Sequence, residues 1–193
     1  MRQEKTSMHL FFAAVLLLVL SATGLDAKEQ KMPFPQYGTG PVEVRIYSDY
    51  FCPPCRAMKP QVDPILRELL KRNAITLIWV DTPFSRKSVL YARYFLYAMK
   101  RKNNADHAFG VRQVLYDATL DRQMTTEAHL EGLFKSKGIP YEVFEPKPVF
   151  DRLNALIKED KVNATPTCVI VRDGGKASFL GGQDIATALQ GLR

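Results

Sequence analysis

Two cysteines separated by two prolines are the residues of this sequence best suited to chemistry, in the segment Phe51-Cys52-Pro53-Pro54-Cys55. They follow an apolar alternating run and precede a helical pattern, so they should stand where a strand ends and a helix begins. The free N–H groups of a helix N-terminus favour negative charge, and Cys52 should therefore form a thiolate readily. Cys55, one helical turn further in, should be more enclosed and less reactive. This arrangement favours thiol–disulfide exchange.

A zinc site and a purely structural disulfide are the other interpretations of this cysteine pair. Zinc usually takes four ligands, normally with a second Cys/His pair at similar spacing. The sequence has no such pair. The position between strand and helix favours redox chemistry over both alternatives, so we predict a redox dithiol with no bound metal and no other cofactor.

The third cysteine, Cys168, lies in an apolar run, where a small buried side chain is the expected role. Two functional alternatives stay open for it: a third metal ligand beside the dithiol, or a second redox thiol. His107 and His129 fall on predicted helices, and we expect them at the surface or in helix packing rather than in a ligand set.

The N-terminal residues 1–27 have the pattern of a secretory signal. Arg2 and Lys5 give a positive start, and the apolar run that follows, residues 10–20, has eleven residues. A membrane-spanning helix needs about twenty, so an uncleaved anchor is the lesser alternative. Cleavage is expected after Gly24 or after Ala27. The mature protein should then be periplasmic or otherwise extracytoplasmic, in a compartment where a disulfide persists.

The charge of the chain is basic, with a formal net charge of +7. A basic surface suits nucleic acids, anionic membranes or acidic substrates. The lysines and arginines are scattered among acidic residues, however, and we interpret them as ordinary solvated surface. We therefore expect no nucleic-acid partner.

Hydrophobic spacing predicts a mixed order of strands and helices around the dithiol. The segment 28–40 reads as a leader without regular structure, and residues 41–81 as strand, helix and buried strand. Residues 82–163 contain only helical patterns, among them helices over 105–118, over 125–137 with Thr126 as its cap, and over 148–160. Residues 164–193 contain a hairpin, turning at Asp173-Gly174-Gly175, and a last helix.

Two short segments carry a resemblance to a known family. Residues 46–55 (IYSDYFCPPC) and 162–167 (VNATPT) resemble the two signatures of a thioredoxin-fold protein. The helical block between them resembles the insertion of the periplasmic disulfide oxidoreductases of the DsbA type, including thioredoxin-like family 4. The resemblance covers nearly the whole mature chain. It implies an α/β protein with a thioredoxin fold and an inserted all-helical subdomain.

The resemblance also implies a role for each site residue. Cys52 would be the nucleophile that forms mixed disulfides, and Cys55 the thiol that resolves them. Pro166 would be a cis-proline beside the dithiol, and Thr165 would offer backbone groups to an extended substrate. The active-site turn would be completed by Phe51, Pro53 and Pro54.

The function implied is an exported oxidase that exchanges disulfides with cysteines of other exported proteins and has a membrane redox partner. One position departs from the oxidising pattern, which usually has histidine before the second cysteine. Pro54 supplies neither a backbone N–H nor a positive charge, so thiolate stabilisation should be weaker and the couple more reducing. A reductase or isomerase of the same fold is therefore an alternative, and a metal carrier that uses the cysteines is a second. The sequence leaves the oligomeric state open.

Overall fold

The computed structural model describes residues 32–192, so the predicted signal over 1–27 and the start of the leader lie outside the described residues. A five-stranded sheet with the order β1-β3-β2-β4-β5 forms the centre of this part. Its strands are β1 (Gln36–Tyr37), β2 (Val42–Ser48), β3 (Ile75–Asp81), β4 (Thr167–Arg172) and β5 (Gly175–Leu180).

Strands β2 and β3 are parallel neighbours, and helix α2 (Pro53–Lys71) connects them. Both strands are buried along most of their length, which explains their nearly continuous apolar sequence. Strand β4 pairs antiparallel with β2, and β5 pairs antiparallel with β4. The β4–β5 hairpin turns at Asp173 and Gly174, which both have positive φ (52° and 76°). Two-residue hairpin turns of this kind favour Asp-Gly.

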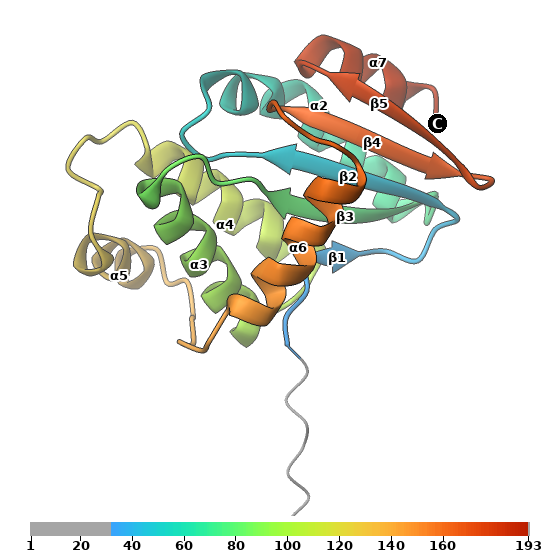
Figure 1. Ribbon diagram of the computed structural model, residues 1–193. Coiled ribbons are helices and arrows are strands. Elements are labelled where there is room, and N and C mark those ends of the chain that lie inside the picture. Colours follow the sequence, from blue (N-terminus) through green and yellow to red (C-terminus); the bar gives the residue numbers. More distant parts are fainter. Residues whose placement is uncertain (1–31, 193) are drawn as a thin grey trace, which may run out of the picture. The chain divides into compact units, whose positions relative to one another are not determined.

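Helices cover both faces of the sheet (Figure 1). Helix α7 (Gly182–Gln190) packs beside α2, and a Cβ at Gly182 would lie only 2.7 Å from the Cβ of Met58. Helix α6 (Lys147–Glu159) crosses the other face, where the hydroxyl oxygen of Tyr47 in β2 lies 3.3 Å from the carbonyl oxygen of Leu156. The thioredoxin fold expected from the sequence is confirmed by this arrangement.

Three helices lie between β3 and α6: α3 (Arg86–Arg101), α4 (Ala105–Ala118) and α5 (Glu127–Ser136). Each begins after a polar residue whose side chain accepts the N–H of the third residue along, namely Ser85, Asn104 and Thr126. Such caps satisfy a backbone donor that the helix leaves free. The structure thus confirms the helix predicted over 105–118 and the expected start near Thr126.

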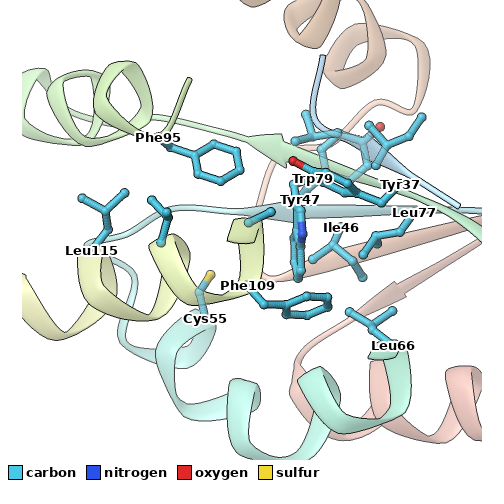
Figure 2. Packing of buried hydrophobic residues seen from close by; sticks show 14 of the residues in the cluster. Tyr37, Ile46, Tyr47, Cys55, Leu66, Leu77, Trp79, Phe95, Phe109 and Leu115 are labelled. Atoms are coloured by element: carbon cyan, nitrogen blue, oxygen red, sulfur yellow. The ribbon is translucent and has the colours of Figure 1, made fainter. Parts of the chain in front are cut away.

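The inserted helices share one hydrophobic core with the sheet (Figure 2). Phe95 of α3 and Phe109 of α4 point toward Trp79 of β3, and the rings of Trp79 and Phe109 lie 5.6 Å apart, edge to face. Burial of each such side chain stabilises the fold by about 1.5–3 kcal/mol. The insertion is therefore packed as part of the same domain.

The leader contributes one element that the sequence pattern did not predict. Gln36 and Tyr37 form the short strand β1, which pairs antiparallel with β3. Gly40 then passes so close to the start of β3 that a Cβ there would lie 2.2 Å from the nitrogen of Ile75. Within residues 32–192, no helix combines the length and the apolar character that crossing a bilayer requires.

Candidate active site

The dithiol stands at the junction of β2 and α2. Cys52 is the N-cap of α2, and Pro53 and Pro54 occupy the first two helical positions. Proline suits these positions because its φ is fixed near the helical value and its missing N–H would have no helical partner. The N–H of Cys55 is consequently the first backbone donor of the helix, and it donates to Cys52 Sγ at 3.3 Å.

The two sulfur atoms lie 2.6 Å apart, with the Cys55 thiol donating to Cys52 Sγ. Both cysteines are free thiols, Cys52 partly exposed and Cys55 buried. Cys55 points into the core from the first turn of α2 (Figure 2). Burial, followed by its hydrogen bond to Cys52, raises the pKa of Cys55 to about 12. Solvent and a partner protein can therefore reach one sulfur of the pair, while the other is held as a protected thiol.

The segment before β4 forms the opposite wall of the site. The peptide bond between Thr165 and Pro166 is cis. The carbonyl oxygen of Thr165 lies 3.5 Å from Cys52 Sγ and accepts its thiol hydrogen, and the carbonyl of Pro166 accepts the N–H of Gly181 at 3.0 Å. The structure thus brings Thr165 and Pro166 to the dithiol from more than a hundred residues away in sequence.

A buried carboxylate fixes the turn that precedes Cys52. Asp49 accepts the N–H of Phe51 at 2.6 Å with one oxygen and the N–H of Phe84 at 3.1 Å with the other. Its own carbonyl accepts the N–H of Cys52 at 3.2 Å. The ring of Phe51 meets the edge of Tyr91 in α3, with centroids 4.9 Å apart. The turn is therefore tied to the beginning of the helical insertion.

Beneath this turn lies a buried arginine that the sequence analysis missed. Arg112 of α4 is 1% exposed and donates to Asp81 at 2.7 Å, to Ser48 Oγ at 2.7 Å and to the hydroxyl of Tyr50 at 3.2 Å. Its guanidinium also lies 4.4 Å from the ring centre of Trp79. Because Ser48 and Tyr50 flank Asp49, Arg112 holds both sides of the turn that presents Cys52.

The ion pair of Arg112 and Asp81 is buried, and this affects the pKa of the carboxyl group. Burial raises the pKa of Asp81, against the opposing effect of the Arg112 charge.

One signal in the sequence could have located Arg112: it stands four residues after Ala108 and four before Tyr116, on the stripe of α4 that faces the core. Its charge argued for the surface instead.

Cys168 takes the structural role expected for it. It is fully buried in β4, opposite Ile46 of β2 and Phe179 of β5, and burial raises the pKa of its thiol to about 12. Across the part of the chain that the structure describes, no three His, Cys, Asp or Glu side chains are grouped so that they could hold a metal. The backbone N–H groups of His107 and His129 are engaged by the helix caps Asn104 and Thr126.

Comparison with known families decides the classification. The family model described as thioredoxin matches residues 38–176. The chain belongs to the thioredoxin family. DsbA-like proteins of this family are thiol–disulfide oxidoreductases, and this chain is an enzyme of that class. No curated protein sequence matches it.

Solved structures similar to this thioredoxin-family chain include Wolbachia pipientis α-DsbA1, with a TM-score of 0.63, 13% identity, and coverage of 86% of this chain and 94% of that one. A periplasmic thioredoxin-like protein from Salmonella enterica serovar Typhimurium matches with a TM-score of 0.61 and 18% identity, and the match covers 83% of this chain and 92% of that one. The catalytic domain of Proteus mirabilis ScsC matches with a TM-score of 0.61 and 16% identity, and the match covers 84% of this chain and 90% of that one. These likenesses show a common fold, and they confirm the resemblance to DsbA-type proteins inferred from the sequence.

Proposed function

We propose that this protein is an extracytoplasmic thiol–disulfide oxidoreductase that oxidises cysteine pairs of exported proteins, with Cys52 as nucleophile and Cys55 as resolving thiol. One observation carries the proposal: a partly exposed sulfur at a helix N-cap lies 2.6 Å from a buried one. The exposed sulfur accepts the N–H of Cys55, which stabilises negative charge on it. The buried sulfur is close enough to displace whatever is bound to the first.

The exchange follows from this asymmetry. In the oxidised protein a substrate thiolate attacks the Cys52 sulfur, the Cys52–Cys55 bond breaks, and Cys55 leaves with the electron pair and takes up a proton. A second substrate thiolate then attacks the substrate sulfur of the mixed disulfide and releases Cys52 as a thiolate. The substrate has lost two electrons and gained a disulfide, and the protein is reduced. The reverse sequence reduces a substrate disulfide.

Substrate orientation is assigned to the wall opposite the dithiol. The carbonyl of Thr165 faces Cys52 at 3.5 Å, so an extended substrate segment passing between them would have a backbone acceptor beside its reacting cysteine. Pro166 would complete this wall, and Phe51, Pro53 and Pro54 the turn across from it. Arg112 would act indirectly, because it positions the turn without touching the sulfurs.

The direction of electron flow depends on how strongly the Cys52 thiolate is stabilised. A single backbone N–H, that of Cys55, is bonded to Cys52 Sγ, since Pro53 and Pro54 have none to give. Each pKa unit of lost thiolate stabilisation is about 1.4 kcal/mol, or about 30 mV for a two-electron couple. This observation favours a mild oxidant and supports reductase or isomerase activity as the second candidate function.

The location and partners follow from the N-terminal pattern and the relatives. A signal over residues 1–27, cleaved after Gly24 or Ala27, would export the chain, and one similar structure is described as periplasmic. Substrates would be cysteine-containing exported proteins. A membrane redox partner would restore the Cys52–Cys55 disulfide after each turnover. Residues 82–163 would serve as the helical insertion of a single thioredoxin-fold domain.

Disulfide transfer to a defined substrate tests the proposal. The oxidised protein is mixed with a reduced, unfolded protein that has two cysteines, and the thiols of both are counted by alkylation and mass spectrometry. We expect the substrate to lose two thiols for each Cys52/Cys55 pair that gains two. Absence of transfer, or equal transfer by Cys52→Ser, would contradict the proposed function.

A further inference from the structure

Large apolar side chains remain exposed on segments that support the dithiol. Phe84, 63% exposed, donates its own backbone N–H to Asp49, and Leu120, 65% exposed, follows Thr119, whose hydroxyl accepts from Arg56 in the first turns of α2. Leu180, 59% exposed, pairs with Thr167 next to Pro166. Each of these three segments is thus connected, through a hydrogen bond or strand pairing, to a residue of the active-site turn, of α2 or of the strand that follows Pro166.

Arginines without an anionic partner occur in the same segments. Within residues 32–192, most arginines contact an acidic side chain or an aromatic ring. These are Arg45, Arg67, Arg72, Arg93, Arg101, Arg112, Arg152 and Arg172. The exceptions are Arg56, Arg86 and Arg122. Arg56 donates only to the Thr119 hydroxyl, while Arg86 and Arg122 are exposed.

Each of the two exposed arginines stands close in sequence to an exposed apolar residue. Arg86 stands two residues after Phe84, and Arg122 two residues after Leu120. Both loops are connected to the active-site turn. Phe84 donates its N–H to Asp49 at 3.1 Å, and Tyr91, on which Phe51 packs, donates its hydroxyl hydrogen to the carbonyl of Met124 at 2.7 Å. The carboxylate of Asp121, between Leu120 and Arg122, accepts a hydrogen bond from the N–H of Gln123 at 2.8 Å.

We propose that this face selects cysteine segments that carry acidic and apolar residues beside the cysteine, with Arg86 and Arg122 as the specificity-determining residues. The proposal rests on the exchange function above and names its substrate class. A guanidinium binds a carboxylate through two parallel hydrogen bonds, and a free arginine on a loop connected to the active-site turn has such a group to offer an incoming chain. The neighbouring apolar residues favour a polypeptide over a purely polar anion.

The experiment measures attack by Cys52 on three short peptides of otherwise equal sequence. Each contains Phe and one cysteine flanked by two Glu, two Ser or two Lys, with the cysteine activated as a mixed disulfide with thionitrobenzoate. In the full mature chain with Cys55→Ser, the Cys52 thiolate attacks the peptide sulfur, forms the protein–peptide disulfide and releases the coloured thionitrobenzoate anion. Each rate is divided by that of glutathione with the same peptide, which removes the peptide's own reactivity.

We expect the Glu peptide to react about tenfold faster than the Lys peptide at low salt, with the ratio falling toward one in concentrated salt, because complementary charge acts mainly on the association rate. Arg86→Glu with Arg122→Glu should remove or reverse the preference. Lys135→Glu with Lys137→Glu is the matched control, since it changes the net charge equally at exposed positions of α5 and the residue after it. The control should keep the preference.

Three outcomes would overturn the proposal: equal rates for all peptides, the same loss in both double variants, or vesicles of anionic lipid that bind through Arg86 and Arg122 while the peptides show no preference. The last would assign these arginines to a membrane surface. A failure of every peptide to react would count against the exchange function itself. The Ser peptide separates the two cases, because it should react whether or not the charge preference exists.

Discussion

Two buried arginines, Arg112 of α4 and Arg45 of β2, differ in whether the groups they bind are connected to the reactive cysteines. Arg112 lies beneath the active-site turn, meets one carboxylate, and is otherwise enclosed by hydroxyls and aromatic rings. Arg45, in the middle of β2, ties α6 to the sheet. It belongs to a cluster of charged and polar groups that includes Glu43, Tyr47, Glu159, Asp160 and Lys176.

The difference lies in what each arginine holds. Arg112 binds Ser48 and Tyr50, which flank the turn before Cys52, so its loss should be felt at the sulfur. Arg45 binds the carboxylates of Glu159 and Asp160 at the end of α6, and neither belongs to the active-site turn. We infer that the first cluster controls both stability and redox behaviour, and that the second controls stability alone.

Cysteine replacement should give the largest effect, because it removes a reacting sulfur. It tests whether the dithiol next to the Arg112 cluster is the reactive site. Cys52→Ser should abolish disulfide exchange, since it removes the only exposed sulfur of the pair. Cys55→Ser should instead accumulate mixed disulfides through Cys52, which non-reducing electrophoresis detects. Equal trapping by both variants would remove the assignment of Cys52 as nucleophile.

Replacement of Arg112 should give the largest loss of stability. Arg112→Met leaves Asp81 buried without its partner, which costs about 3–5 kcal/mol in the free energy of unfolding. The potential of the dithiol should also move to the reducing side, because a buried positive charge beneath the thiolate is lost. Urea denaturation and glutathione equilibration measure the two effects.

A milder variant separates the redox effect of this cluster from unfolding. Tyr50→Phe removes the hydroxyl that links Arg112 to the turn and should cost about 1 kcal/mol of stability, so the variant stays folded. A measurable slowing of exchange in Tyr50→Phe is expected. Unchanged exchange in this variant would limit the Arg112 cluster to a structural role.

Replacement of Arg45 provides the contrasting case. Arg45→Met should lower the free energy of unfolding by about 1–2 kcal/mol, less than Arg112→Met, because this cluster is partly solvated and contains Lys176 as a second cation. The potential of the dithiol should not change. A shift in potential as large as that of Arg112→Met would end the distinction between the two clusters.

The pH dependence of stability should reveal the Arg45 cluster. Burial acts to raise the pKa of Asp160, but hydrogen bonds from Lys176, Tyr47 and Arg45 outweigh it and lower the pKa. The stabilisation is therefore present above the unfolded value of about 3.9 and is lost as the pH falls through the folded pKa. The difference in unfolding free energy between the wild type and Asp160→Asn should be larger at neutral pH than at about pH 3. A difference that does not change would contradict this sign.

A smaller effect is expected at Pro54, within the active-site turn. Pro54→His restores a backbone N–H in the first turn of α2 and adds a possible cation near Cys52. Both favour the thiolate, so the couple should become more oxidising by about 30 mV for each ~1.4 kcal/mol of added thiolate stabilisation. Gln61→His, exposed further along the same helix, is the control and should leave the potential unchanged. A shift of Pro54→His to the reducing side would contradict the electrostatic account.

Local sequence signals predicted the parts of the site that depend on neighbouring residues. Cys52 at the helix start, the turn at Asp173 and Gly174, and the cap at Thr126 all follow from short-range backbone chemistry. Thr165 and Pro166 were placed beside the dithiol only through the family resemblance, because no spacing rule connects segments so far apart.

Tertiary contacts determined what the sequence did not reveal. Strand β1, two residues long, is too short for an alternating pattern and exists because β3 offers it an edge to pair with. Arg112 is buried because Asp81, Ser48 and Tyr50 converge on it from the strand ends and the turn. The charge of Arg112 predicted an exposed side chain, but hydrogen-bonding partners from distant parts of the sequence allow it to be buried.

The equilibrium between this protein and glutathione buffers tests the central claim most directly. Samples equilibrated over a range of potentials are alkylated, and mass spectrometry identifies which cysteines are free. We predict one two-electron transition confined to Cys52 and Cys55, with Cys168 free throughout and a midpoint between about −120 mV and about −270 mV, the values of a strong oxidant and a reductant of this fold. The absence of any transition, or a transition that involves Cys168, would contradict the assignment of this pair as the redox centre.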